Sequence, residues 1–218
     1  MQTSLRLSAL AFVLTLAMSA AGAQEFEEPG TEEPLPVPEE NLAPQPPVYD
    51  DVPLKAETEK TRLDELFDKL KKAQDPRYAK TLADGIWSHW FRSGSATVDL
   101  MMGWANEAYE EEKYNVALDF LDQVTIRAPD FAEGWNRRAT LHYSMDNFAK
   151  SMTDIQKALA LEPRHFGALA GMATILERTG KKEAALKAWM RALEVYPAME
   201  SAQSAVIRLS DELAADPV

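Results

Sequence analysis

The sequence predicts an all-α protein built from stacked helix–turn–helix repeats. Three prolines, Pro129, Pro163 and Pro197, follow one another at intervals of 34 residues. Because proline has no N–H and disfavours helical geometry in the residue before it, each of them ends a helix. Small residues recur at the same interval, at Ala105, Ala139 and Ala173. Small side chains let two helices cross closely, so this period indicates helix pairs that must stack to bury their apolar faces.

Aligning the chain on the three prolines gives units at 97–130, 131–164 and 165–198. Two further columns of mostly small residues lie in the second helix of each unit, and a column of large apolar residues lies between them. The two columns are Ala117, Ser151 and Ala185, and Val124, Ala158 and Ala192; the large residues are Leu121, Ile155 and Trp189. Large side chains beside a close crossing fill the gaps that the small ones leave.

A divergent unit at 59–94 precedes these three. Leu63, Leu66, Phe67 and Leu70 recur at i, i+3, i+4 and i+7, which predicts one buried helical face. The "DPRY" segment turns the chain into a second helix, and "RSGS" takes the place of the proline turn. In that second helix, three residues occupy the columns of Ala117, Leu121 and Val124; they are Ala83, Trp87 and Trp90.

The last segment, 199–215, reads as a more polar helix that caps the final unit. A terminal repeat needs such a cap because its outer face has no further unit to cover it.

The 34-residue columns resemble the tetratricopeptide repeat (TPR) family. Trp135 matches the family's tryptophan, Tyr114 and Phe148 match its turn aromatic, and Gly180 matches its turn glycine. The resemblance spans 59–215 and implies a right-handed superhelix. The phrases "GWNRRA" and "LEPRHFGALAG" also resemble a group of exported TPR proteins of alphaproteobacteria, which implies a periplasmic setting.

Residues 1–23 read as a secretory signal peptide that is cleaved after Ala23. Arg6 precedes an apolar run from Leu7 to Met18, and small residues Ala21 and Ala23 frame the cleavage site. As a helix this run would rise about 18 Å, short of the roughly 30 Å core of a bilayer. We therefore expect a mature chain outside the cytoplasm with no membrane span.

Residues 24–58 read as an acidic, proline-rich, disordered linker. Between Gln24 and Pro53 the chain has eight prolines, nine acidic residues and no Lys or Arg. Such a segment stays extended and acts as a stiff tether, or it docks on a basic or proline-recognising surface. The formal charge of the whole chain is −12, which argues against nucleic acid as a partner.

The sequence offers no catalytic constellation, so we expect a protein that is not an enzyme and that takes no cofactor or metal. The chain has no cysteine, and His89, His142 and His165 lack the paired spacing of a helical metal site. The run Glu110, Glu111 and Glu112 reads as the solvated end of a helix.

The resemblance implies a concave face lined by the first helix of each unit. Positions 2, 5, 9 and 12 of these helices share that face. They are Asp99, Met102, Asn106 and Tyr109; Glu133, Asn136, Thr140 and Tyr143; and Gly167, Ala170, Thr174 and Glu177. The predicted partner-binding residues are Asn106, Tyr109, Asn136, Arg137, Thr140 and Tyr143. The chaperone-binding TPR branch would have Lys, Lys and Arg where this chain has Met102, Gly167 and Gly171, so a chaperone partner is not expected.

Two adjacent arginines receive different predicted roles. Arg137 falls at the groove edge, where it could meet a carboxylate or backbone oxygen of a partner. Arg138 falls where the family keeps an apolar residue, so its burial requires partners, and Asp122 and Asp154 are the candidates.

The sequence therefore predicts a periplasmic module that binds a peptide or envelope protein in the concave groove. The alternative is a structural or self-assembling envelope component that makes its contacts through the repeat ends or the acidic arm. A third class, an accessory of an envelope hydrolase with weak catalysis, has no candidate residue.

Overall fold

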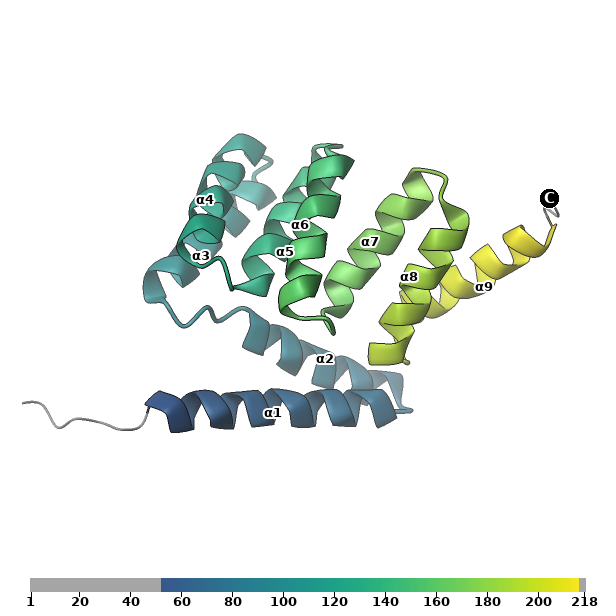
Figure 1. Cartoon of the computed structure of the whole chain (residues 1–218), viewed down its shortest axis with the longest axis horizontal. Helices are drawn as coiled ribbons and strands as arrows, with labels where there is room; N and C mark the ends of the chain where they lie inside the picture. Colours follow the sequence, from purple (N-terminus) through teal and green to yellow (C-terminus); the bar gives the residue numbers. More distant parts are fainter. Residues whose placement is uncertain (1–51, 216–218) are drawn as a thin grey trace, which may run out of the picture. The chain divides into compact units, whose positions relative to one another are not determined.

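The computed structural model describes residues 52–215, which form helices joined by short turns and contain no strand (Figure 1). The helices are α1 (Val52–Lys72), α2 (Pro76–Trp90), α3 (Ala96–Glu110), α4 (Tyr114–Arg127), α5 (Ala132–Ser144), α6 (Phe148–Leu161), α7 (Phe166–Arg178), α8 (Lys182–Val195) and α9 (Glu200–Ala215). The predicted signal peptide and most of the predicted linker lie outside the described residues. No described helix combines the length and apolar character needed to cross a membrane.

Three helix pairs, α3–α4, α5–α6 and α7–α8, stack side by side in the predicted order (Figure 1). The small-residue columns lie at the crossings, where Ala105, Ala139 and Ala173 are 3%, 2% and 0% exposed. Ser151, in the column of the second helices, is also buried, and its hydroxyl donates to the carbonyl of Ala139 at 2.7 Å. The predicted all-α repeat fold is therefore confirmed.

The turn inside each pair has the same backbone geometry. One residue in each turn has a positive φ: Glu112 at 58°, Asp146 at 57° and Gly180 at 74°. The next N–H then reaches back to the last turn of the first helix, as from Lys113 to the carbonyl of Ala108 at 2.8 Å. Glycine adopts this left-handed conformation without a Cβ penalty. A glycine marks the positive-φ position of these turns in the sequence only at Gly180.

Helix α9 covers the outer side of α7–α8, as predicted for the cap. Ala202, Ala205 and Leu209 of α9 are buried in one cluster with Ala188 and Trp189 of α8. The apolar face of the last repeat is thus removed from water at this end of the stack.

The N-terminal boundary differs from the prediction, because α1 begins at Val52 and not after residue 58. Pro53 falls in the first turn of this helix. The first helical residues have no intrahelical acceptor for their N–H groups, so a proline is tolerated there and does not block the helix. The end of the predicted linker is therefore helical.

The hairpin of α1 and α2 also packs in an unexpected place. Its buried residues, including Phe67 and Trp90, cluster with Phe166 of α7 and with Val195 and Tyr196 at the end of α8. Among the described residues, no side chain of α3 or α4 belongs to this cluster. The predicted divergent unit is therefore a helix pair, but it does not stack on the next repeat as the other pairs do.

Arg138 lies between α4, α5 and α6 with the partners that the sequence predicted. Its Nη2 and Nε donate to the two carboxylate oxygens of Asp154 at 2.8 and 2.9 Å. Its Nη1 donates to Asp122 at 2.8 Å and to the Thr125 hydroxyl at 2.9 Å. Hydrogen bonding to Asp154 is the main cause that raises the pKa of Arg138 above its usual value. This side chain joins consecutive repeats.

Replacing Arg138 with alanine should lower the free energy of unfolding by about 3 kcal/mol, because the buried Asp154 carboxylate would lose its bidentate partner. Urea unfolding followed by circular dichroism measures the loss. The control is Arg127→Ala on the exposed end of α4, for which we expect a change within about 0.5 kcal/mol. Equal losses in the two variants would contradict the structural role of Arg138.

Candidate functional site

The six predicted partner-binding residues lie together on the first helices of the repeats, where they line two adjoining hollows. The first hollow is lined by Met102, Ala105, Asn106, Tyr109, Leu121, Arg137, Thr140 and Leu141. The second is lined by Asn136, Ala139, Thr140, Tyr143, Ser151, Ile155, Gly167, Gly171, Thr174 and Ile175. Thr140 belongs to both hollows and is exposed to solvent between them.

The first hollow has an apolar floor and a polar rim. The Asn106 amide donates to Glu110 at 2.8 Å, and its oxygen accepts from Nη1 of Arg137 at 3.4 Å. The Tyr109 hydroxyl hydrogen-bonds to the Ser144 hydroxyl at 2.8 Å, which joins α3 to α5. These contacts hold amide and hydroxyl groups at the edge of an apolar depression.

Of the three predicted residues that line the second hollow, Asn136 and Tyr143 differ in character. Asn136 is 7% exposed, and its amide donates to Glu133 at 2.9 Å. Tyr143 is half-buried, packs against Phe148, and carries the guanidinium of Arg178 at 5.3 Å from its ring centre. Tyr143 can therefore meet a partner directly, whereas Asn136 mainly supports the groove from below.

A buried carboxylate holds this part of the groove together. Glu133 is 1% exposed, although a first-turn acid at position 2 of its helix normally faces water. It accepts from Nε of Arg137 at 2.7 Å, from Asn136 at 2.9 Å, and from Nε2 of His165 at 3.0 Å. Three donors thus converge on one carboxylate and tie α5 to the start of α7.

The tautomer of His165 follows from its contacts. Its Nδ1 accepts from the backbone N–H of Ala168 at 3.1 Å, and the ring is fully buried. With Nδ1 as an acceptor, the neutral ring carries its proton on Nε2, which then donates to Glu133. His165 therefore caps α7 and completes the Glu133 cluster at the same time.

The end of α2 covers one side of this cluster. The Trp90 ring stacks on His165, with centroids 4.0 Å apart and planes within 7°. Trp87 lies against Gly167, where an added Cβ would be 2.7 Å from the indole. Phe91, which follows α2, lies under the guanidinium of Arg137 at 4.7 Å. The hairpin therefore occupies the groove beside the first turns of α5 and α7.

Sequence reasoning missed this covering, and the interpretation of Arg137 changes with it. The columns that Trp87 and Trp90 occupy predict side chains packed inside the stack. Trp90 is buried, but α2 packs on the groove and not on the next repeat along the chain. Arg137 already has a carboxylate partner in Glu133 and an aromatic ring beneath it. The available signal in the sequence was the pair Trp87 and Trp90, which follows the "DPRY" turn, together with Gly167, whose missing side chain leaves room for an indole ring.

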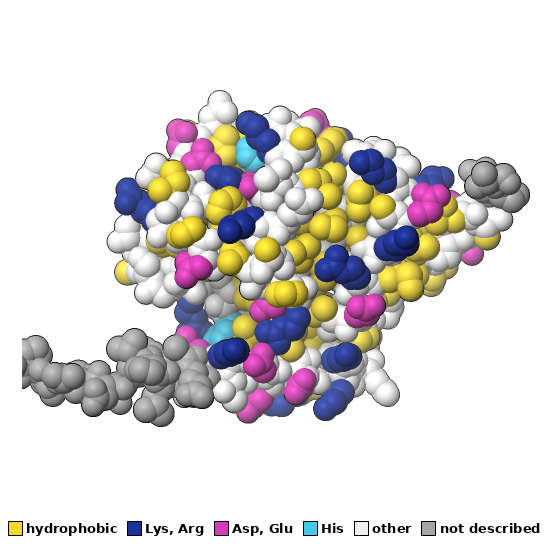
Figure 2. Space-filling view, viewed as in Figure 1, with side chains coloured by type: hydrophobic (Ala, Val, Ile, Leu, Met, Phe, Trp, Pro, Cys, Tyr) yellow, Lys and Arg dark blue, Asp and Glu magenta, His cyan; other side chains and the backbone are white. Residues whose placement is uncertain are grey.

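On the face shown in Figure 2, basic and acidic side chains are interspersed, and neither sign dominates. Within residues 52–215, no group of three or more His, Cys, Asp or Glu side chains could hold a metal ion. The site offers shape, apolar surface and hydrogen-bonding groups.

Glu133→Gln should be destabilising even though the two side chains have the same shape. All three partners of Glu133 are donors, so the amide N–H₂ of glutamine would face a donor. We expect a loss of about 1–3 kcal/mol in the free energy of unfolding, measured by urea titration. The exposed Glu107→Gln on α3 is the matched control, and a loss there as large as at Glu133 would contradict the convergence of donors.

Comparison with known proteins agrees with this architecture. The tetratricopeptide repeat family model matches residues 132–165. A TPR repeat-containing protein of Rhizobium etli is 52% identical over 155 residues, which cover 71% of this chain and 76% of that protein. This level of identity and coverage shows a common family.

Solved structures share the fold at lower identity. The first TPR domain of Spaghetti (RPAP3), bound to an HSP90 peptide, has a TM-score of 0.52 and 23% identity, covering 54% of this chain and 93% of that domain. The Sgt2 TPR domain of Aspergillus fumigatus has a TM-score of 0.52 and 16% identity, with coverages of 57% and 87%. With its repeat columns buried at the helix crossings and a close relative of the same kind, the chain belongs to the tetratricopeptide repeat family.

Proposed function

We propose that this protein is a periplasmic interaction module that binds an extended segment of a partner protein in the two hollows of its groove. TPR folds generally mediate protein–protein or peptide interactions. The observation that carries the proposal for this chain is that the six predicted residues line two adjoining hollows that meet at Thr140.

The chemistry of the hollows specifies what kind of segment fits. Each has an apolar floor, formed around Leu121 and Leu141 in one and Ile155 and Ile175 in the other. Amide and hydroxyl groups at the rims can bond a peptide backbone, while the floors accept apolar side chains. An extended segment with two apolar anchors therefore matches the site.

An acidic chain end is a poor match. In Spaghetti (RPAP3) the bound peptide is SRMEEVD from HSP90, which shows that such a groove can hold a peptide. This chain has Met102, Gly167 and Gly171 where the chaperone-binding branch would have cations. Arg137, the cation on the groove edge, is already paired with Glu133. Recognition here should depend on apolar anchors more than on a terminal carboxylate.

A photo-crosslinking amino acid at Thr140 should capture a discrete partner protein in the envelope of the native host, because this position faces both hollows. The same group at Thr153, on the exposed surface of α6, is the matched control. Mass spectrometry of the adduct identifies the partner and the segment that is bound.

The groove assignment gains a second test that uses no crosslinker: Thr140→Arg places a long side chain at the position shared by the two hollows and should reduce affinity capture of the identified partner at least tenfold, whereas Thr153→Arg should leave that capture unchanged. Identical adducts from the two crosslinker positions, or capture that survives Thr140→Arg, would show that the partner binds elsewhere.

The proposed location rests on the signal-like sequence of residues 1–23. When the full chain is expressed in a Gram-negative host, the protein recovered from the periplasm should begin at Gln24, as read by mass spectrometry of its N-terminus. Recovery in the cytoplasm with Met1 and Arg6 still present would contradict the proposal.

A second candidate, self-assembly through a repeat end, is favoured by one observation. Leu100 and Trp104 at the α3 end of the stack are 52% and 43% exposed. Size-exclusion chromatography with light scattering on the mature chain separates the two candidates, since a monomer contradicts self-assembly.

A further inference from the structure

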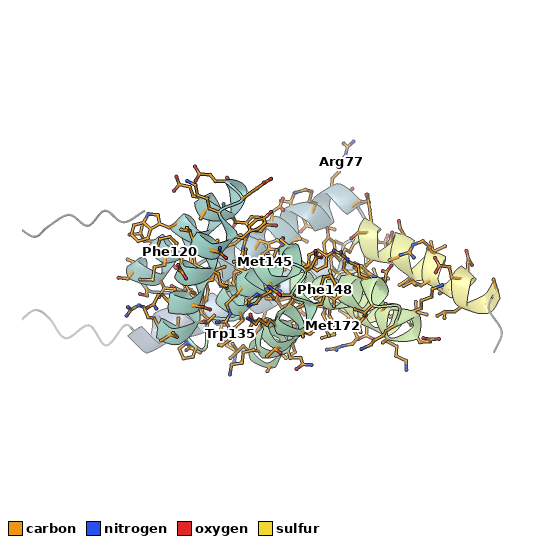
Figure 3. All side chains as sticks on the ribbon, turned by 90° about the horizontal axis from the view of Figure 1, so that it is seen from above. Arg77, Phe120, Trp135, Met145, Phe148 and Met172 are labelled. Carbon is orange, nitrogen blue, oxygen red and sulfur yellow. The ribbon has the colours of Figure 1, made fainter. Side chains whose placement is uncertain are left out.

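The α3–α4 end of the stack carries an uncovered apolar surface. This open face consists of Leu100 and Trp104 of α3 and Val116 and Phe120 of α4. Leu100, Trp104 and Val116 are 52%, 43% and 45% exposed, and the rings of Trp104 and Phe120 lie 5.4 Å apart. Figure 3 shows Phe120 at the end of the stack opposite to α9. The two ends of the stack are therefore finished differently.

The repeat period shows that Leu100 of the open face lies on a stacking surface. The residue 34 positions after Leu100 is Gly134, and the next is Ala168; both are buried. Gly134 is covered by Val124 of the preceding repeat, so closely that an added Cβ would lie 2.7 Å from it. Leu100 occupies the same place in its own repeat, but no preceding repeat covers it.

The sequence of α2 corresponds to the missing cover. Ala83, Trp87 and Trp90 stand 34 residues before Ala117, Leu121 and Val124. Trp90 is thus the counterpart of Val124, the residue that covers Gly134, and in a regular stack it would cover Leu100. The hairpin carries the columns of a first repeat, although it packs on α7 and α8.

Charge also favours the hairpin as the occupant of the open face. The last turn of α1 is basic, with Lys69, Lys71 and Lys72. The depression around Trp104 and Phe120 is bordered by Glu107, Glu111 and Lys113; Glu111 is paired with Lys113 at 2.6 Å, so Glu107 is the carboxylate left to meet a basic segment. First helices lie side by side in a regular stack, so these opposite charges would face each other.

The connection between α2 and α3 permits movement of the hairpin. Only residues 91–95 separate the two helices. Gly94 has a φ of +82°, and an added Cβ there would meet nothing within 4 Å. A short segment with a glycine is where a hinge absorbs a change in backbone angles. Ser93 donates its N–H and its hydroxyl to Asp99 of α3 at 2.8 and 2.6 Å, so a change at Gly94 must break these two bonds, whereas a change at residues 91 and 92 can leave them in place.

We propose that the open face is a second docking site for the α1–α2 hairpin, taken when the hairpin leaves the groove. This move would uncover Gly167, His165 and the face of the Arg137 guanidinium that lies over Phe91. It would bury Leu100 and Trp104. Only the functional consequence of this move rests on the proposed function. A partner segment too long for the two hollows could then also bind the part of the groove that the hairpin now fills. The hairpin thereby acts as an internal competitor of the ligand.

The test needs no partner, so its outcome is independent of whether the groove binds a peptide. Gly167→Leu places a side chain where Trp87 lies and should expel the hairpin. Gly103→Leu is the matched control, because an added Cβ there meets nothing within 4 Å. The chain has no cysteine, so nitroxide labels can be attached at introduced cysteines alone. Two label pairs use exposed positions on α2, α4 and α8. One pair is Thr81→Cys with Gln123→Cys, and the other is Thr81→Cys with Glu194→Cys.

Double electron–electron resonance should show two changes in Gly167→Leu relative to the control. The distance from 81 to 194 should lengthen, and the distance from 81 to 123 should gain a shorter population. Adding Trp104→Glu, which spoils the open face, should remove the short population and leave the lengthening. If Gly167→Leu loses its helical circular dichroism, Trp87→Ala replaces it and is interpreted in the same way.

Three results would overturn the proposal. The hairpin could keep its distance to position 194 in every folded variant, or it could leave the groove without approaching position 123. A doubled mass by light scattering in Gly167→Leu, abolished by Trp104→Glu, would assign the open face to a second copy of the chain.

Discussion

A pair of short helices cannot bury its own apolar faces, and this constraint governs the whole chain. The middle pair, α5–α6, is covered on both sides by its neighbours. The last pair is covered by α9 through Ala202, Ala205 and Leu209. The first pair is covered on one side only, because the hairpin that could cover the other side lies in the groove. The same constraint therefore explains the cap, the open face and the filled part of the groove.

Two clusters of charged side chains lie between consecutive repeats, where a stack of this kind usually has apolar contacts. Arg138 meets Asp122 and Asp154 between the first and second repeats, and Glu133 meets His165 between the second and third. Arg138, Asp154 and Glu133 each have several hydrogen bonds, which offsets the desolvation that burial costs. These clusters fix the positions of neighbouring repeats, and the Glu133 cluster also forms the surface on which Trp90 stacks.

Much of this fold was predictable because the repeat period is a local signal. The prolines and small residues fixed the three units, and the same frame placed Arg138 beside its two acidic partners. Other features depend on distant contacts. Leu63 and Phe67 show that α1 has a buried face, but periodicity does not tell what covers that face. Glu133 looks like an ordinary first-turn acid, and its burial follows only from the approach of His165 and the hairpin.

The central claim is that the hairpin lies against α7 and leaves the α3 end of the stack uncovered. Nuclear Overhauser contacts in the mature wild-type protein test this directly, since Trp87, Trp90 and Trp104 each carry indole protons that report on their neighbours. The account predicts contacts from Trp87 to the Hα protons of Gly167 and from Trp90 to the ring of His165, with none from either indole to Leu100. Contacts from Trp90 to Leu100 or Trp104 in the wild type, with none to His165, would contradict it.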